Sequence, residues 1–323
     1  MRVTVAICTW NRADLLDQTL GTLRDVRVPE GLEWEVLVVN NNCTDHTDEV
    51  VARHAGPLPL RRVFEPAQGH SNARNRAVAE ATGDLLLWTD DDVLVGREWL
   101  AEMAKAAGDF PGASYFGGAI EPWFGEEPPG WLRANLGLLG GVLVILDHGP
   151  EVRRLREGEM VFGASLAFRT EVLRGRLFDP DLGRKGTSLI GYDEVGLTRQ
   201  LHAEGKYGVW VGTSRLRHYI PSSRMTERFV WDWFVADGRS AVRAGYASFG
   251  GRRVGGVPVH LVLGYARQRL RCLRRSAAAD RGWLEALRDA AQTRGFVAEL
   301  RQEHLKRLRG PGRRAVDDAG ARA

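Results

Sequence analysis

The chain has 323 residues, 44% of them hydrophobic and 27% charged, which excludes a disordered protein and leaves room for one large or two ordinary domains. Three cysteines without C-x-x-C spacing argue against a disulfide framework and a zinc site. The net charge of +4 is uneven, because residues 252–323 carry 17 Lys and Arg against 7 Asp and Glu. A mildly acidic body therefore precedes a basic tail, which favours an anionic surface as partner.

The segment before the first predicted strand, Val3–Cys8, has no basic leader and no apolar core, so we expect no signal peptide. The longest apolar runs, Leu136–Leu146 and Val254–Ala266, are shorter than the ~20 residues that span a bilayer. With sparse cysteines, these features predict a cytoplasmic protein without a transmembrane helix.

Strands and helices alternate in the first third of the chain. Four apolar runs predict strands: Val3–Cys8, Trp34–Val39, Leu60–Glu65 and Leu85–Trp88. Between them lie helical patterns, the first with Asp14 as its expected cap and the second with Thr44 or Asp45. This order favours an open, mostly parallel sheet, in which the polar segments that follow the strands meet at one edge.

Three consecutive carboxylates, Asp90, Asp91 and Asp92, follow the strand Leu85–Trp88, whose unbroken apolar run predicts burial on both faces. Three like charges at the end of a buried strand are unfavourable unless a cation neutralises them. Mg²⁺ and Mn²⁺ prefer such oxygen ligands and bridge them to phosphates; a solvated acidic turn is the alternative. Because no Gly-x-Gly-x-x-Gly or Walker-type loop is present, phosphate charge would have to be met by a metal and by side chains.

The pattern after these aspartates is less regular. It predicts a helix over Trp99–Ala107, a long ordered loop over Gly117–Trp131, a strand over Val161–Arg169 and a polar loop over Asp179–Ile190. A helix from about Gly191, a short strand over Tyr207–Val211, a helical stretch over 222–250 and one or two basic helices over 257–309 complete the prediction.

Six segments occur in a characteristic order: Thr9–Arg12 (TWNR), Asn40–Asp45 (NNNCTD), Gly69–Asn75 (GHSNARN), Thr89–Val93 (TDDDV), Gly163–Arg169 (GASLAFR) and Gly191–Gly205 (GYDEVGLTRQLHAEG). Together they resemble a family 2 glycosyltransferase with the GT-A fold, over roughly residues 1–240. The resemblance implies an α/β fold with a Rossmann-like, mostly parallel sheet flanked by helices, to which this chain adds a C-terminal basic helical extension.

We accordingly expect a GT-A domain over residues 1–250. Its nucleotide-binding half would cover about 1–115 and its acceptor-binding half about 116–250. A basic helical extension over 251–309 and a disordered tail over 310–323 would follow.

The resemblance also implies an activity, the inverting transfer of a hexose-type sugar from a nucleoside diphosphate donor to an acceptor hydroxyl with Mg²⁺ or Mn²⁺. Thr9, Asn11 and Arg12 would lie beside the base and ribose, and Arg74 would face the nucleotide or its diphosphate. Asn41 stands where the family often has an Asp that contacts the base. The base, usually uracil, is therefore left open, as is the acceptor, which could be a glycan, a lipid-linked molecule or a small molecule.

Asp90 and Asp92 match the outer carboxylates of the D-x-D pattern of this family. Asp92 is the expected direct metal ligand and Asp90 the residue nearer the ribose, with Asp91 as the substitute in either role. His218 matches a His that completes the metal or diphosphate site in some members. An ordinary histidine beside a strand is the alternative.

Asp193 is the expected general base, since it falls where the family has an acidic pair. A carboxylate on the acceptor side would take the hydroxyl proton as the nucleophile attacks in line. Here Tyr192 replaces the first acidic residue, and Glu194 follows, so Glu194 is the alternative base. Asp193 could instead cap the helix that starts there.

Two other functions compete with this interpretation. A sugar-1-phosphate nucleotidyltransferase would resemble its relatives in a Gly-rich, Arg-containing loop after the first strand, where this chain reads TWNRADLL. The second is a GT-A scaffold that only binds its ligand. Nucleic acid is not an expected partner, because the tail shows no aromatic stacking signature.

Residues 252–275 hold seven arginines and no acidic residue, and this part of the tail allows two interpretations. In one, Leu261, Leu263, Leu270 and Leu273 of a helix pack on the catalytic domain. In the other, the helix makes a peripheral contact with the inner face of the membrane.

Overall fold

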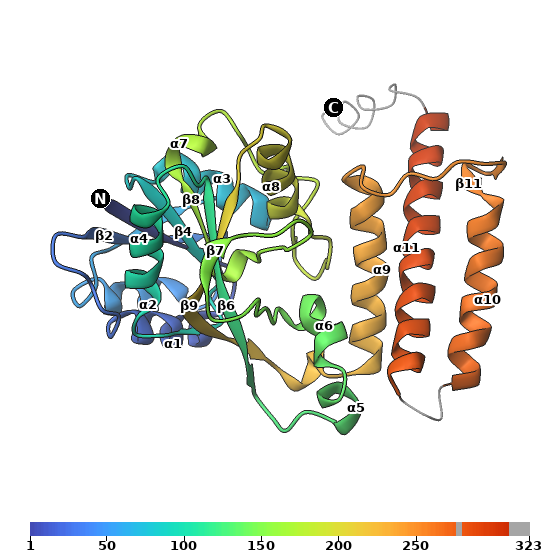
Figure 1. Ribbon diagram of the computed structural model, residues 1–323, viewed down its shortest axis with the longest axis horizontal. Coiled ribbons are helices and arrows are strands. Elements are labelled where there is room, and N and C mark those ends of the chain that lie inside the picture. The colour runs from blue at the N-terminus through green and yellow to red at the C-terminus, as the bar shows by residue number, and fades with distance from the viewer. Residues whose placement is uncertain (276–279, 310–323) are drawn as a thin grey trace, which may run out of the picture. The chain divides into compact units, whose positions relative to one another are not determined.

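The computed structural model of the protein describes residues 1–275 and 280–309. It divides into two compact units, Met1–Val230 and a second unit that starts at Trp231, both drawn in Figure 1. The predicted domain boundary near residue 250 stays a prediction, and the tail 310–323, predicted to be disordered, lies outside the described residues.

The first unit contains nine strands: β1 (Arg2–Thr9), β2 (Glu33–Asn40), β3 (Leu60–Phe64), β4 (Leu85–Thr89), β5 (Val93–Val95), β6 (Tyr115–Phe124), β7 (Val152–Arg154), β8 (Leu166–Arg169) and β9 (Gly208–Ile220). Its helices are α1 (Ala13–Leu23), α2 (Thr47–His54), α3 (His70–Glu80), α4 (Trp99–Asp109), α5 (Gly130–Arg133), α6 (Leu136–Leu143), α7 (Thr170–Leu173) and α8 (Asp193–Ala203). The second unit holds most of α9 (Glu227–Arg243), then β10 (Arg253–Val254), β11 (Val257–Pro258), α10 (Val259–Arg275) and α11 (Arg281–Arg309).

All nine strands of the first unit join one sheet, ordered β3-β2-β1-β4-β8-β6-β9-β5 with β7 beside β9. The pairs β2–β3, β1–β2 and β1–β4 are parallel, whereas β8 enters antiparallel to β4. The predicted α/β class, with a mostly parallel sheet, flanking helices and C-terminal helices, is confirmed. The carboxyl ends of β1, β2 and β4 therefore lie at one edge, as the strand order predicts.

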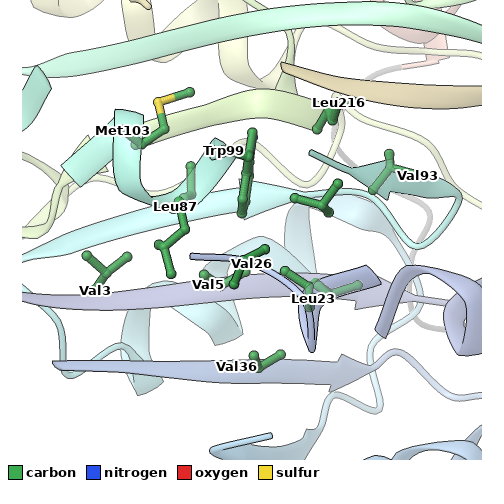
Figure 2. Close-up of a cluster of buried hydrophobic side chains, with 14 of the residues drawn as sticks. Val3, Val5, Leu23, Val26, Val36, Leu87, Val93, Trp99, Met103 and Leu216 are labelled. Atoms are coloured by element: carbon green, nitrogen blue, oxygen red, sulfur yellow. The ribbon is translucent and has the colours of Figure 1, made fainter. Parts of the chain in front are cut away.

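Both faces of β4 are buried, as its unbroken apolar run predicts. Leu85 and Leu87 belong to a core with the side chains of α1 and α4, whereas Leu86 and Trp88 belong to a core with those of α3 and α8. Figure 2 shows Leu87 beside Val3 and Val5 of β1, with Trp99 of α4 above them. The strand that carries the aspartates is thus held from both sides.

The predicted loop Gly117–Trp131 is wrong, because Gly117–Phe124 forms most of β6. Glycine there reflects close packing and not a turn: a Cβ on Gly118 would lie 2.5 Å from Ser165 Oγ and 2.7 Å from the Ser214 carbonyl oxygen. The strand predicted over Tyr207–Val211 is also too short, since β9 continues to Ile220.

Asp45 caps the starts of both α1 and α2, whereas the sequence predicted Asp14 as the cap of the first helix. Asp45 accepts hydrogen bonds from the backbone N–H of Ala13, at the start of α1, and of Thr47, at the start of α2. Asp14 instead lies inside the first turn of α1. One carboxylate therefore fixes the starts of two helices.

The second unit is mainly helical. Gly238 of α9 and Gly295 of α11 allow a close crossing, because a Cβ on Gly295 would lie 2.2 Å from the Val235 carbonyl oxygen. The buried Glu299 of α11 accepts hydrogen bonds from Arg239 and Arg243 of α9 at 2.9 Å and 3.0 Å. Among the described residues, no helix has both the length and the apolarity needed to cross a bilayer.

Candidate active site

The aspartates that follow β4 meet an arginine that follows β1. Asp91 and Asp92 are buried, at 5% and 3% exposure. Arg12 Nη1 donates to Asp91 Oδ1 at 3.0 Å and to Asp92 Oδ2 at 2.9 Å. Asn11, just before it, has a φ of 51°, an uncommon left-handed value that turns the chain from strand to helix. The alternative of a solvated acidic turn is therefore wrong for Asp91 and Asp92.

Neighbouring charges separate the pKa values of these two carboxyls. Burial raises the pKa of Asp91 to about 6, although Arg12 opposes the rise. Burial also acts to raise the pKa of Asp92, but His218 and Arg12 outweigh it and hold that pKa well below its usual range. Asp92 is thus ionised at neutral pH, as a metal ligand must be.

The pairing of β9 with β5 places His218 next to the aspartates. His218 lies within β9, opposite Val93 of β5, and not beyond the short strand that the sequence predicts over Tyr207–Val211. The backbone N–H of Tyr219 donates to the Asp92 carbonyl oxygen at 2.8 Å. Strand pairing between segments more than 120 residues apart therefore sets the position of this imidazole.

Asp90, Asp92 and His218 each offer a ligand atom within 4.8 Å of the other two. Within residues 1–275 and 280–309, Asp92 Oδ1 and His218 Nδ1 are buried atoms without a hydrogen-bond partner. Asp92 Oδ1 lies 3.4 Å from His218 Nε2. Because buried polar atoms are normally satisfied, this donor set fits a divalent cation such as Mg²⁺ or Mn²⁺.

The sequence motifs did not predict two arginines near these aspartates, Arg184 and Arg224. Arg224 Nη2 is 3.8 Å from Asp92 Oδ2, and its side chain is 11% exposed. Burial lowers the pKa of Arg184, and the charges of Arg224 and Arg12 lower it further. Arg184 lies in the predicted polar loop, but no local pattern marks Arg224. Three guanidinium groups that repel one another form a site suited to a polyanion.

A second group of charges surrounds Asp193, the first residue of α8. Arg74 of α3, 3% exposed, donates from Nη1 to Asp193 Oδ2 at 2.8 Å and lies 3.3 Å from Glu194 Oε2. His70 Nδ1 is 3.3 Å from Asp193 Oδ2. The residue before the helix, Tyr192, has a φ of 81°, a strained value for a non-glycine residue. No side-chain hydrogen bond caps α8, so the cap alternative for Asp193 has no support.

The carboxyl groups of Asp193 and Glu194 share one proton at neutral pH. Burial and the charge of Asp193 raise the pKa of Glu194 to about 8. Burial opposes ionisation of Asp193 too, but Arg74 outweighs it and holds that pKa well below its usual range. Asp193 is therefore the ionised member of the pair, and Glu194 carries the proton.

Both charged groups lie within electrostatic reach of the end of β1. Burial raises the pKa of the Cys8 thiol to about 12, and Asp90, Asp91 and Asp193 act in the same direction. Arg74 likewise interacts with Asp193 and with Asp90. Arg74, Asp90 and Asp193, which lie far apart in the sequence, are therefore close enough to interact near the end of β1.

Asn41 is buried, and its side-chain amide forms hydrogen bonds with backbone groups. Its Nδ2 donates to the carbonyl oxygens of Glu65 and Ala67 at 3.0 Å and 2.8 Å, and its Oδ1 accepts from the Gly69 N–H at 2.9 Å. Both amide hydrogens are used within the chain. Asn41 therefore orders the segment that leads into α3, and contact with a base stays a prediction.

Thr9 and Asn11 flank the end of β1. Thr9 is buried at 2% exposure. The Asn11 side chain accepts a hydrogen bond from the Thr44 N–H at 2.7 Å and donates to Thr44 Oγ1 at 3.2 Å. Asn11 thus joins the turns that follow β1 and β2, and its predicted contact with the nucleotide is untested.

Comparison with known proteins identifies relatives. The model of Glycosyl transferase family 2 matches residues 4–174, more than half of the chain. The succinoglycan biosynthesis protein ExoM of Rhizobium meliloti is 29% identical over 188 residues, 58% of either chain. Validoxylamine A glucosyltransferase of Streptomyces hygroscopicus subsp. limoneus is 37% identical over 113 residues, 34% of this chain and 24% of that protein. The chain thus matches less than two thirds of the length of these relatives.

Two solved structures share the fold. The mannosyltransferase PcManGT from Pyrobaculum calidifontis, in complex with GDP-Man and Mn²⁺, aligns with a TM-score of 0.55 at 20% identity, over 96% of this chain and 76% of that chain. Staphylococcus aureus TarS 1–349, in complex with UDP-GlcNAc, aligns with a TM-score of 0.53 at 16% identity, over 96% of this chain and 92% of that chain. At these identities the likeness shows the GT-A fold alone.

The raised pKa of Glu194 generates a stability prediction. The folded protein keeps this proton up to about pH 8, whereas the unfolded chain releases it near 4.5. Between these values the folded state binds more protons, so its stability falls as the pH rises. Glu194→Gln removes this titration, so its stability relative to the wild type should increase from about pH 5 to about pH 8. Thermal unfolding across this range measures it, and a pH-independent difference would contradict the shared proton.

Proposed function

The chain belongs to glycosyl transferase family 2, and on that premise we propose that it transfers a sugar from a nucleoside diphosphate donor to an acceptor hydroxyl. The observation that carries the proposal is the set Asp90, Asp92 and His218, in which Asp92 and His218 are buried and Asp90 is partly exposed, with three arginines around it. A second, separate carboxylate, Asp193, lies at the same sheet edge. This arrangement would supply one site for a diphosphate leaving group and one for a hydroxyl nucleophile, as a single displacement requires.

Asp90, Asp92 and His218 would hold the divalent cation. A cation bound there would supply charge neutralisation for the diphosphate. Arg12, Arg184 and Arg224 would contact the phosphate oxygens, and their mutual repulsion would be relieved by the bound anion. Positive groups fixed before the donor arrives need little reorganisation when charge develops on the leaving group.

Asp193 is proposed as the general base. In a single in-line displacement, the acceptor oxygen forms a bond to the anomeric carbon while the bond from that carbon to the diphosphate oxygen breaks, which inverts the configuration. The hydroxyl proton passes to Asp193, which is ionised at neutral pH, whereas Glu194 is already protonated. Arg74 and His70 hold the carboxylate in place.

A uridine diphosphate sugar is the proposed donor. The solved TarS complex contains UDP-GlcNAc and the PcManGT complex contains GDP-Man, so the fold accepts either base. Because both amide hydrogens of Asn41 are used by the backbone, base selection would rest on other groups. The acceptor is proposed only as a hydroxyl of a glycan, a lipid-linked molecule or a small molecule.

The Asp92→Ala variant tests the metal-dependent donor site. The variant should bind UDP at least about tenfold more weakly than the wild type in Mn²⁺, the scale of one lost charge-assisted contact. In EDTA it should bind no more weakly than the wild type, because the loss of Asp92 removes a negative charge from the site and leaves Arg12 paired with Asp91 alone. Calorimetric titration of UDP and GDP measures this, with Asp109→Ala, an exposed helix-end carboxylate, as control. Equal affinities in Mn²⁺ would refute the assignment.

The Asp193→Asn variant tests the base. It should fold and bind donor as the wild type does, yet release nucleoside diphosphate from UDP-sugars at least about 10²-fold more slowly, the scale of general-base loss. Glu194→Gln mimics the protonated state and should keep most of the activity at pH 7. Steady-state nucleotide release measures both. If Glu194→Gln were inactive and Asp193→Asn active, Glu194 would be the base.

A further inference from the structure

One face of α10 exposes apolar side chains. Of the four leucines that one interpretation packed on the catalytic domain, only Leu261 is buried, in a cluster with Val242, Val257 and Leu300. Leu263, Leu270 and Leu273 are 54%, 49% and 60% exposed. Packing of this helix within its own unit therefore covers Leu261 and leaves Leu263, Leu270 and Leu273 exposed.

These exposed residues fall on one stripe of the helix. At 3.6 residues per turn, Val262, Ala266, Leu270 and Leu273 follow one another along the axis, with Leu263 beside Leu270. Val262 is 49% exposed, and Ala266 is exposed as well. The buried Leu261 and Cys272 lie on the opposite side. We call the stripe of Val262, Leu263, Ala266, Leu270 and Leu273 the α10 face.

Positive charge borders the α10 face. Arg267 and Arg271 are exposed and lie on one flank, next to Leu263 and Leu270 along the helix. Arg269, on the other flank, stacks over Trp231 with its guanidinium carbon 4.7 Å from the ring centroid. Residues 252–275 contain seven arginines and no acidic residue, so no carboxylate of this segment neutralises them.

From this juxtaposition of an exposed apolar stripe with arginines on its flanks, we propose that the α10 face docks on an anionic lipid bilayer. The leucines enter the headgroup boundary while the arginines contact lipid phosphates, with the helix lying in the plane of the interface. The chain is thus held on a membrane surface without a spanning helix. This docking is separate from the proposed transfer reaction and does not depend on it.

Charge complementarity favours a bilayer over other occupants of the α10 face. A second copy of the chain in a two-fold dimer would bring the same arginine-rich segments together, with no acidic residue in 252–275 to pair with them. Nucleic acid would satisfy the arginines but would leave the leucine stripe without an apolar partner. An anionic bilayer satisfies both kinds of side chain at once.

Vesicle co-sedimentation of the full chain tests the proposal. The protein should sediment with phosphatidylcholine–phosphatidylglycerol vesicles at low salt, and less at high salt or with phosphatidylcholine alone. Arg267→Gln with Arg271→Gln should weaken binding about 25-fold, about fivefold for each arginine. Leu263→Gln with Leu270→Gln should weaken it about tenfold or more without changing the charge.

Matched controls come from exposed residues elsewhere. Arg294→Gln with Arg301→Gln removes two exposed arginines of α11, and Met160→Gln with Leu177→Gln replaces side chains that are 54% and 76% exposed. Both controls should bind vesicles as the wild type does. The proposal is overturned if the wild type stays in the supernatant with anionic vesicles at low salt, or if the leucine variant binds equally well. It is also overturned if light scattering shows a dimer that the leucine variant dissociates while vesicle binding is absent.

Discussion

The structure depends on burying the carboxylates of Asp91 and Asp92 at the end of a strand that is itself buried on both faces. Such charges are stable only with partners, and Arg12, in the turn after the neighbouring parallel strand β1, supplies one partner. The pairing of β1 with β4 brings the loops after the two strands to the same edge of the sheet. His218 is placed beside them because β9 pairs antiparallel with β5. The cationic surroundings of Asp92 are therefore a consequence of sheet topology.

The helix α3 connects this edge to the second pair of carboxylates. Arg74 is buried between the aromatic rings of Trp88 and Phe178, with its guanidinium carbon 5.6 Å and 5.4 Å from their centroids. Such a guanidinium is fixed before any ligand binds. Its pairing keeps Asp193 ionised and leaves the proton on Glu194. One face of a single helix thus sets the protonation of the proposed base, while the sheet edge sets the charge around the proposed leaving group.

Local patterns predicted the strands β1 to β4 and the aspartates, because an apolar run followed by carboxylates is visible within a dozen residues. Arg224 could not be found in this way, since its approach to Asp92 depends on β9 pairing with β5. The glycines of β6 resembled loop residues because their close contacts, Val161, Ser165 and Ser214, lie far away in the sequence. Asn41 matched a ligand position in the motif, yet its hydrogen bonds all go to the backbone. The features that the sequence did not predict depend on contacts between residues that are far apart in the chain.

Asp90, Asp92 and His218 are proposed to hold a divalent cation to which the donor diphosphate binds, with Arg12, Arg184 and Arg224 around it. The most direct measurement is anomalous scattering from a crystal of the protein grown with Mn²⁺ and UDP. We expect one manganese peak, coordinated by these three side chains and by phosphate oxygens. A diphosphate bound on the arginines without manganese, or manganese bound away from Asp92, would contradict it.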